Sequence, residues 1–241
     1  MDRPVIGLIL DEMLDPPQDG SAFSRRPFYA LRIDYFDAVA AAGGAPVAIP
    51  YRADALDEYL RLCDGWLIPG GDYRFQADWY ETPPPAALVQ PSLRRGIEIE
   101  AARRILAADA PVLGVCNGMQ VLAGVTGGKI AWRGPGPRPG GTIAHGDPGG
   151  ALMHHEVTLA PDGPLAGLFG AGRIRANSAH REDVVRLGPG ARLAAQADDG
   201  VIEALSVPGR RFAIGVQWHP ELEAGQPPPL VAALVAAARG R

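Results

Sequence analysis

A single stretch near the middle of the chain, residues 111–120, most constrains the fold. Pro111 is followed by the apolar run Val112–Val115, which has the length and the β-branched residues of a buried parallel strand. The run ends at Cys116, and a helical pattern begins directly after it. We therefore expect a strand, a sharp turn and a helix to meet at one thiol.

This arrangement makes Cys116 a candidate nucleophile. A thiol at a helix N-terminus lies among unpaired backbone N–H groups and at the positive end of the helix dipole, which together favour the thiolate. Gly114 and Gly118 flank the cysteine, and such small residues let the backbone turn tightly, as in the elbow that presents nucleophiles in other α/β enzymes. An isolated cysteine after an apolar strand is more often a packing residue, so a partner is needed to decide between the two.

The partner lies about a hundred residues downstream. Residues 211–218 predict another strand, which delivers His219 and Glu221 at its end. A catalytic cysteine needs a base, and the base needs a third group to orient it. In an extended segment two residues that far apart project to the same side, and Pro220 keeps the segment extended. The alternative is a surface turn in which a histidine lies near an acid by chance.

Both stretches resemble the class I glutamine amidotransferase superfamily, whose members have a G-x-C-x-G-x-Q elbow and an H-P-E ending. The chain further resembles the gamma-glutamyl hydrolase branch that includes gamma-glutamyl-gamma-aminobutyrate hydrolases, the peptidase C26 type. The matching pieces, in chain order, are residues 4–7, 35–50, 64–71, 177–180, 199–204 and 217–221.

The resemblance implies a Cys116, His219 and Glu221 triad that forms a glutamyl thioester. It also implies that the backbone N–H groups of Gly71 and Asn117 form the oxyanion hole. Taken without the resemblance, the glycine pair before Asp72 is more typical of a simple Gly-rich turn than of a functional site.

By the same resemblance, Gln120, Ser178 and Ala179 bind the alpha-amino and alpha-carboxylate groups of the glutamyl substrate. His180 lacks an adjacent acid, so we interpret it as structural or adjacent to the substrate. The chain departs from the branch pattern near the site, in residues 72–75, at Asn117 where arginine is common, and at 181–182 where His-Gln is usual.

The order of strand and helix patterns predicts an α/β fold. We expect a doubly wound, mostly parallel sheet flanked by helices, flavodoxin-like, as one domain over residues 1–241. The predicted strands are 5–10, 47–49, 65–68, 112–115, 173–177, 192–197, 201–206 and 212–217, and the predicted helices are 29–42, 54–62 (capped by Asp54), 92–108 and 230–238.

Composition excludes several classes of function. The apolar fraction of 47% supports a packed core, and the net charge of -4 with interspersed signs predicts no nucleic-acid partner. We find no signal sequence and no apolar run of membrane-spanning length, so we expect a cytoplasmic protein without membrane contact. With Cys116 assigned to chemistry, Cys63 has no disulfide partner, and it is expected to be a buried small hydrophobe.

The segment 134–150 contains eleven Gly or Pro in seventeen residues, so it is expected to lack regular structure, either as a flap near the site or as a surface excursion. His145, His154 and His155 punctuate this region. No Cys or acidic residue completes a recognisable ligand spacing around them, and we predict no metal site. Glu98 is either a buried structural acid or solvated.

The sequence thus predicts a cysteine hydrolase that needs no cofactor and acts on a small gamma-glutamyl amide, with polyamine catabolism as the implied setting. Two alternatives stay open: a glutaminase subunit that supplies ammonia to a separate synthase, and a non-catalytic ligand-binding protein of the same fold. A homodimer is left open by the sequence, as is the amine that leaves.

Overall fold

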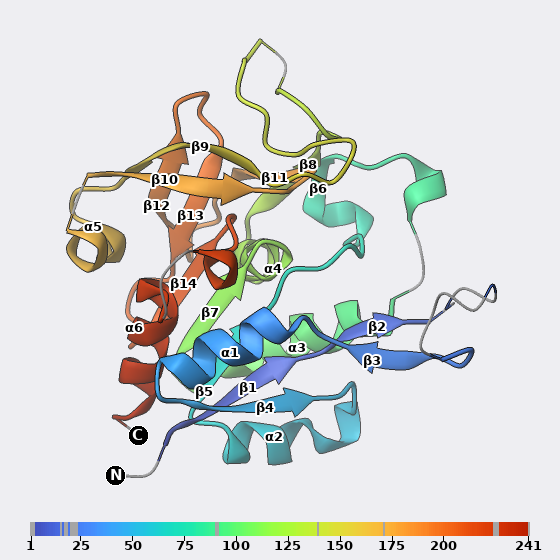
Figure 1. The fold of residues 1–241 in the computed structure, drawn as a ribbon, viewed down its shortest axis with the longest axis vertical. Coiled ribbons are helices and arrows are strands. Elements are labelled where there is room, and N and C mark those ends of the chain that lie inside the picture. The colour runs from blue at the N-terminus through green and yellow to red at the C-terminus, as the bar shows by residue number, and fades with distance from the viewer. Residues whose placement is uncertain are drawn as a thin grey trace.

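A mixed sheet with helices on both faces organises the computed structural model, which describes residues 3–14, 16, 19, 24–89, 92–138, 140–170, 172–223 and 227–240 (Figure 1). Within these residues the main path of the sheet runs β10-β9-β12-β13-β14-β7-β5-β1-β4. Its strands are β1 Val5–Ile9, β4 Ala45–Ile49, β5 Gly65–Ile68, β7 Val112–Val115, β9 Met153–Leu159, β10 Arg173–Ser178, β12 Arg192–Ala197, β13 Ile202–Ser206 and β14 Ala213–Val216.

The parallel part of the sheet, β14-β7-β5-β1-β4, places the carboxyl ends of several strands side by side. Gly215 pairs with Gly114 across β14 and β7, and Ile68 pairs with Gly114 across β5 and β7. The residues that follow these strands therefore meet at one edge, which is where open α/β sheets bind ligands. Cys116 follows β7, Pro69 follows β5, and the segment leading to His219 follows β14.

Two hydrophobic cores cover the two faces of the sheet. One face is covered by α1 Ile33–Ala41 and α6 Pro229–Ala238, which contribute buried Tyr35, Val39 and Leu234. The other is covered by α2 Leu56–Leu62, α3 Leu93–Ala107 and α4 Asn117–Val125 (Figure 1). These layers confirm the predicted doubly wound α/β architecture.

Antiparallel strands extend the sheet beyond β14. They include β9, β10, β12 and β13, while β6 Tyr80–Thr82, β8 Lys129–Trp132 and β11 Glu182–Arg186 form a branch that pairs with β13. The short helix α5 Pro164–Phe169 connects β9 to β10. The turn at Asp199 and Gly200 joins β12 to β13, as predicted. None of the described helices is both long and apolar enough to span a bilayer.

Two helix boundaries differ from the prediction. Residues Phe28–Ala30 form strand β3, which pairs with β2 Asp11–Met13, so α1 begins at Ile33 rather than at residue 29. The helix expected from Asp54 starts as a 3-10 turn, and α2 begins only at Leu56. The Asp54 carboxylate accepts hydrogen bonds from Arg52 instead of capping the helix.

The elbow requires glycine because α4 lies against β5 with no room for a side chain. A Cβ atom added at Gly118 would lie 2.1 Å from the carbonyl oxygen of Ile68, and one added at Gly114 would lie 2.5 Å from the carbonyl oxygen of Gly118. Both contacts are with backbone, which cannot swing away.

Gly118→Ala is therefore expected to destabilise the protein by about 1 to 3 kcal/mol, the usual cost of overpacking. Gly96→Ala is the matched control, because Gly96 also lies in a helix and a Cβ there meets nothing within 4 Å. The control is expected to stabilise by about 0.5 to 1 kcal/mol. Urea unfolding of both variants measures the difference, and equal effects would contradict the packing argument.

Candidate active site

Cys116 stands at the turn between β7 and α4 in a conformation that is rare for a residue with a side chain. Its φ is 51° and its ψ is -104°, and it is the N-cap residue of α4. Such strain persists only where the surroundings enforce it, and it clusters at functional sites. The Cys116 N–H donates to the Val216 carbonyl at 2.8 Å, and its carbonyl accepts from the Gln120 N–H at 3.2 Å. The sheet and the helix thus hold the elbow from both sides.

His219 is positioned by its backbone and oriented by Glu221. The Asn177 side chain donates to the His219 carbonyl at 2.8 Å and accepts from the His219 N–H at 2.9 Å. Nδ1 of the imidazole lies 2.8 Å from Glu221 Oε1, which assigns the Nδ1 proton to that contact. The imidazole also forms a hydrogen bond with the Cys116 side chain. The structure therefore brings all three predicted triad residues together.

The charge balance of this group favours a protonated imidazole. Burial lowers the pKa of His219, but hydrogen bonding and attraction to Cys116 and Glu221 outweigh it and raise that pKa to about 9. Because the acidic form persists well above the usual histidine range, His219 is suited to hand a proton to a leaving group at neutral pH.

Sequence reasoning missed Arg32, which also contacts the triad. Its Nη2 lies 2.6 Å from Glu221 Oε1 and donates to the Tyr35 hydroxyl at 3.2 Å. The Glu221 carboxylate therefore accepts from both Arg32 and His219, and the guanidinium fixes its orientation. Arg32 stands 189 residues from Glu221, so no local motif signals the contact.

The predicted oxyanion loop after β5 is held by a buried arginine. Arg94 donates to the Pro69 carbonyl at 2.7 Å and to the Gly70 carbonyl at 3.0 Å. Tyr35 accepts the Gly70 N–H at 3.0 Å, which leaves Gly71 as the next N–H donor on the loop. Gly71 and Asn117 both line the cavity beside Cys116, in keeping with the predicted pair of donors.

Glu98 is a buried structural acid, which resolves the choice left by the sequence. It is fully buried and accepts a hydrogen bond from Arg94 Nε at 2.7 Å and another from the Tyr73 hydroxyl. Removing one partner of a buried ion pair leaves an uncompensated charge, so Glu98 keeps Arg94 in place under the loop.

Two cavities meet at Cys116. The first, of about 170 Å³, includes Gln120 and Ala179 in its lining, and the second, of about 520 Å³, includes Tyr35 and Arg32. Both are lined by Gly71, Asp72, Cys116 and Ala179. A substrate that spans the thiol would place one group in each cavity.

Gln120 and Ser178 are buried, and their side chains already have protein partners. Gln120 Nε2 donates to the Glu182 carbonyl at 3.0 Å, and the Ser178 hydroxyl donates to the His145 carbonyl at 2.8 Å. Ser178 does not line the first cavity, whereas Ala179 does. Any contact from Ser178 to a ligand would therefore come through the backbone.

The first cavity also contains an arginine and a glutamate, Arg74 and Glu182, at two of the positions where the chain departs from the family pattern. Arg74 Nε lies 3.5 Å from Glu182 Oε1, and Tyr80 donates to the same oxygen at 2.8 Å. Burial raises the pKa of Glu182 to about 7, against the lowering effect of Arg74 and Tyr80. The guanidinium of Arg74 lies over the Trp132 ring at 4.7 Å.

The three histidines weighed as ligands in the sequence separate into two kinds. His154 is exposed, whereas His145 and His155 are buried. The buried pair meets His180 and Glu203, and potential ligand atoms of the four residues lie within 4.8 Å of one another. The missing acid is thus supplied from β13, far along the chain.

Comparisons with known proteins identify the family and the fold. The family model of peptidase C26 matches residues 4–221. The chain is 29% identical over 259 aligned residues to a glutamine amidotransferase-like protein of Rickettsia prowazekii, covering 91% of this chain and 92% of the relative. It is 28% identical to the gamma-glutamyl-gamma-aminobutyrate hydrolase PuuD of Escherichia coli, covering 92% and 87%. The glutaminase domain of Trypanosoma brucei CTPS superposes with a TM-score of 0.67 at 18% identity, covering 99% and 94%.

Cys116→Ala is expected to give a folded protein without detectable amide hydrolysis, because the second cysteine, Cys63, is buried elsewhere. Glu221→Gln keeps the shape and removes only the charge, so its loss of kcat/KM is expected to be smaller. Circular dichroism and glutamate release from a gamma-glutamyl amide measure both. Retained turnover in Cys116→Ala would remove the nucleophile assignment, and equal losses would contradict the supporting role of Glu221.

The raised pKa of His219 predicts the alkaline limb of the pH profile. Its protonated form is favoured up to about pH 9, so kcat/KM is expected to fall as pH rises through that value and the proton for the leaving group is lost. A fall with its midpoint near 6.5, the ordinary histidine value, would show that the imidazolium is not stabilised. A buffer series from pH 6 to 10.5 at constant ionic strength makes the measurement.

Proposed function

The chain belongs to the peptidase C26 family, and we propose that it is a stand-alone cysteine hydrolase that cleaves a gamma-glutamyl amide to glutamate and an amine. The observation that carries the proposal is the contact of Cys116 with His219 and of His219 with Glu221, at a point where two cavities meet. A nucleophile, a base and an orienting acid are the parts that acyl transfer needs.

In the proposed reaction the Cys116 thiolate attacks the gamma-carbonyl carbon of the substrate. The N–H groups of Gly71 and Asn117 then bind the oxyanion, and losing one such donor typically costs about 2.7 to 4 kcal/mol. His219 gives its proton to the amine nitrogen as the C–N bond breaks, which leaves a glutamyl thioester on Cys116.

The second half of the reaction regenerates the thiolate. Neutral His219 takes a proton from water, and the resulting hydroxide attacks the thioester carbonyl. Glutamate leaves with the new C–O bond, and the C–S bond electrons return to Cys116. Glu221 holds the imidazole in orientation through both steps, and no cofactor takes part.

The charges around the first cavity support its assignment to the glutamyl head. Arg74 and Arg181 face the alpha-carboxylate in this proposal, and Asp147 and Glu182 face the alpha-ammonium. Opposite charges in a narrow cavity match a zwitterion. Gln120 also lines this cavity, in keeping with the role that the family resemblance gives it.

The second cavity supports a leaving group larger than ammonia. Asp11 from β2 and Ala30 from β3 border it, and residues 15, 17–18 and 20–23 between these two strands lie outside the described part. Arg74, from the segment after β5, lines the first cavity and not the second. A substituted amine fills the second cavity with contacts that position the scissile bond, and ammonia makes none.

We expect gamma-glutamyl-gamma-aminobutyrate, or a close gamma-glutamyl amine, to be hydrolysed with a higher kcat/KM than glutamine. Glutamate release from a panel of gamma-glutamyl amides by the purified chain makes the measurement. Cys116→Ala serves as the blank for each substrate.

A chain that is inert toward the whole panel but releases ammonia from glutamine when a synthase is added would overturn the hydrolase proposal. It would establish a glutaminase subunit instead. Binding of the panel without turnover by the wild-type chain would establish a ligand-binding protein.

A further inference from the structure

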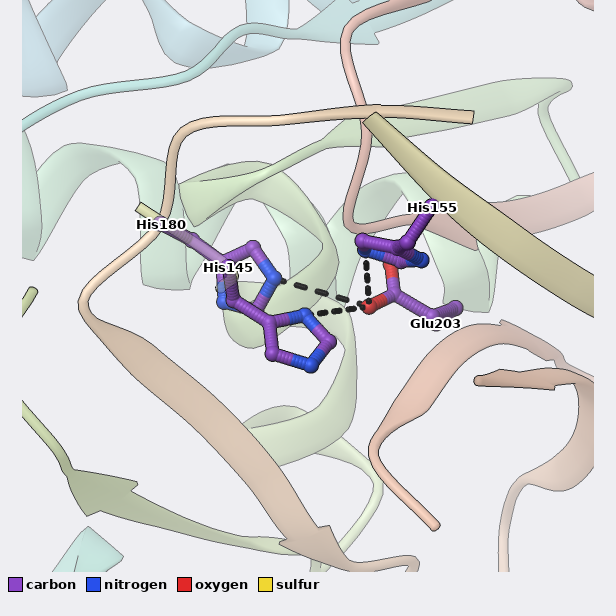
Figure 2. Close-up of side chains that lie close together, drawn as sticks. All are labelled: His145, His155, His180 and Glu203. Carbon is purple, nitrogen blue, oxygen red and sulfur yellow. Dashed lines mark ion pairs between the residues drawn. The ribbon is translucent and has the colours of Figure 1, made fainter. Parts of the chain in front are cut away.

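Four buried side chains behind the first cavity converge on one point. His145 comes from the Gly/Pro-rich segment, His155 lies in β9, His180 follows the end of β10, and Glu203 lies in β13. Their exposed fractions are 0%, 8%, 3% and 0% respectively. Figure 2 shows the three imidazoles arranged around the Glu203 carboxylate, each with a nitrogen turned toward the same oxygen.

The inner atoms have the spacing of ligands that share an ion. Glu203 Oε1 lies 3.1 Å from His145 Nδ1, 3.4 Å from His155 Nε2 and 3.5 Å from His180 Nε2. Ligand atoms about 2.0 to 2.1 Å from a tetrahedral zinc ion are about 3.3 Å apart. The four atoms lie within 4.8 Å of one another, so a small rotation of the imidazoles completes the tetrahedron.

The outer nitrogen of each imidazole faces an oxygen acceptor. His145 Nε2 lies 2.9 Å from Asp199 Oδ2, and His180 Nδ1 lies 3.1 Å from Asp183 Oδ1. His155 Nδ1 lies 3.3 Å from the Glu156 carbonyl. A proton on each outer nitrogen leaves the inner nitrogen free to bind a metal ion. Such outer contacts are the usual partners of metal-bound histidines.

The inner atoms, by contrast, have no hydrogen-bond partner. His145 Nδ1, His155 Nε2, His180 Nε2 and both Glu203 oxygens are buried without one. Three imidazole nitrogens and a carboxylate therefore meet in a buried pocket, an arrangement that is costly unless a positive charge, on a metal ion or as a proton on an imidazole, balances the carboxylate.

We propose that His145, His155, His180 and Glu203 bind one divalent first-row transition metal ion, and that zinc is the metal that fits best. Three imidazoles and one carboxylate are a ligand set that zinc accepts in tetrahedral geometry. Because all four ligands are buried protein groups, the coordination is closed and the ion is structural rather than catalytic.

The site connects the Gly/Pro-rich segment to the substrate cavity. The His145 carbonyl accepts hydrogen bonds from the Ser178 hydroxyl at 2.8 Å and from the His180 N–H at 2.9 Å. Gly146, Ala179 and His180 line the first cavity. An ion bound to both His145 and His180 thus fixes the wall of that cavity, so its removal is expected to raise KM more than it lowers kcat.

The test is metal binding itself, which does not depend on the identity of the substrate. The first-row metals from manganese to zinc are measured in tag-free protein by mass spectrometry. The protein is then stripped with a chelator and titrated with zinc chloride by calorimetry. Both steps are done on the wild type and on Cys116→Ala, which excludes zinc binding by the thiol of Cys116. We expect one equivalent of metal, a higher Tm on zinc addition, and the visible absorption of four-coordinate cobalt in the substituted protein.

His155→Ala and Glu203→Gln are expected to weaken zinc binding at least 100-fold, whereas the matched control His154→Ala, one residue away and exposed, leaves it unchanged. Glu203→Gln keeps the volume of the side chain, so it reports on ligation if His155→Ala fails to fold. The proposal is overturned if the stripped wild type binds no zinc at micromolar concentration, or if Glu203→Gln and His155→Ala bind as tightly as His154→Ala. Either result would mean that a proton on an imidazole, not a metal, balances the Glu203 charge.

Discussion

The close approach of α4 to the parallel strands is the constraint on which the rest of the site depends. Gly118 packs against the Ile68 carbonyl, and this contact forces the chain to turn within one residue, at Cys116. The thiol is raised out of the sheet at the N-terminus of α4, where the Asn117 N–H is unpaired within the helix. A strained φ at one residue thus places the proposed nucleophile and one of its two proposed oxyanion donors together beside the cavities.

The remaining groups reach the thiol because parallel strands end at the same edge. β5 and β14 flank β7, so the loop at Pro69 and the segment at His219 arrive on opposite sides of Cys116. Each arrival is then fixed by a buried polar side chain, Arg94 for the loop and Asn177 for the histidine. Precision comes from these supporting contacts, because the strand ends alone set position only coarsely.

The sequence was sufficient to predict that Cys116, His219 and Glu221 lie together, because each belongs to a local pattern. Cys116 ends an apolar run, and His219 and Glu221 flank a proline at the end of another. Arg32 could not be predicted in this way, since its partner Glu221 lies 189 residues away. The helix start at residue 29 was wrong for a related reason: Phe28–Ala30 pairs with Asp11–Met13, a tertiary contact that overrides local propensity.

The Gly/Pro-rich segment, residues 134–150, raises a question of energy: some interaction must offset the conformational entropy that the segment loses when it is ordered. Fixing a residue costs about 1 to 2 kcal/mol of backbone entropy. Among the described residues of 134–150, which leave out 139, only the bridge between Pro137 and Ala144 is regular, beside a few turn hydrogen bonds. Prolines lower the cost by restricting the unfolded chain, whereas the seven glycines raise it. The segment is nevertheless anchored by two buried side chains, Arg138 on Asp183 and His145 beside Glu203. Ordering seventeen residues costs roughly 17 to 34 kcal/mol on this scale. A structural zinc contributes about 10 to 16 kcal/mol in small domains, so the proposed ion would offset a large part of that cost.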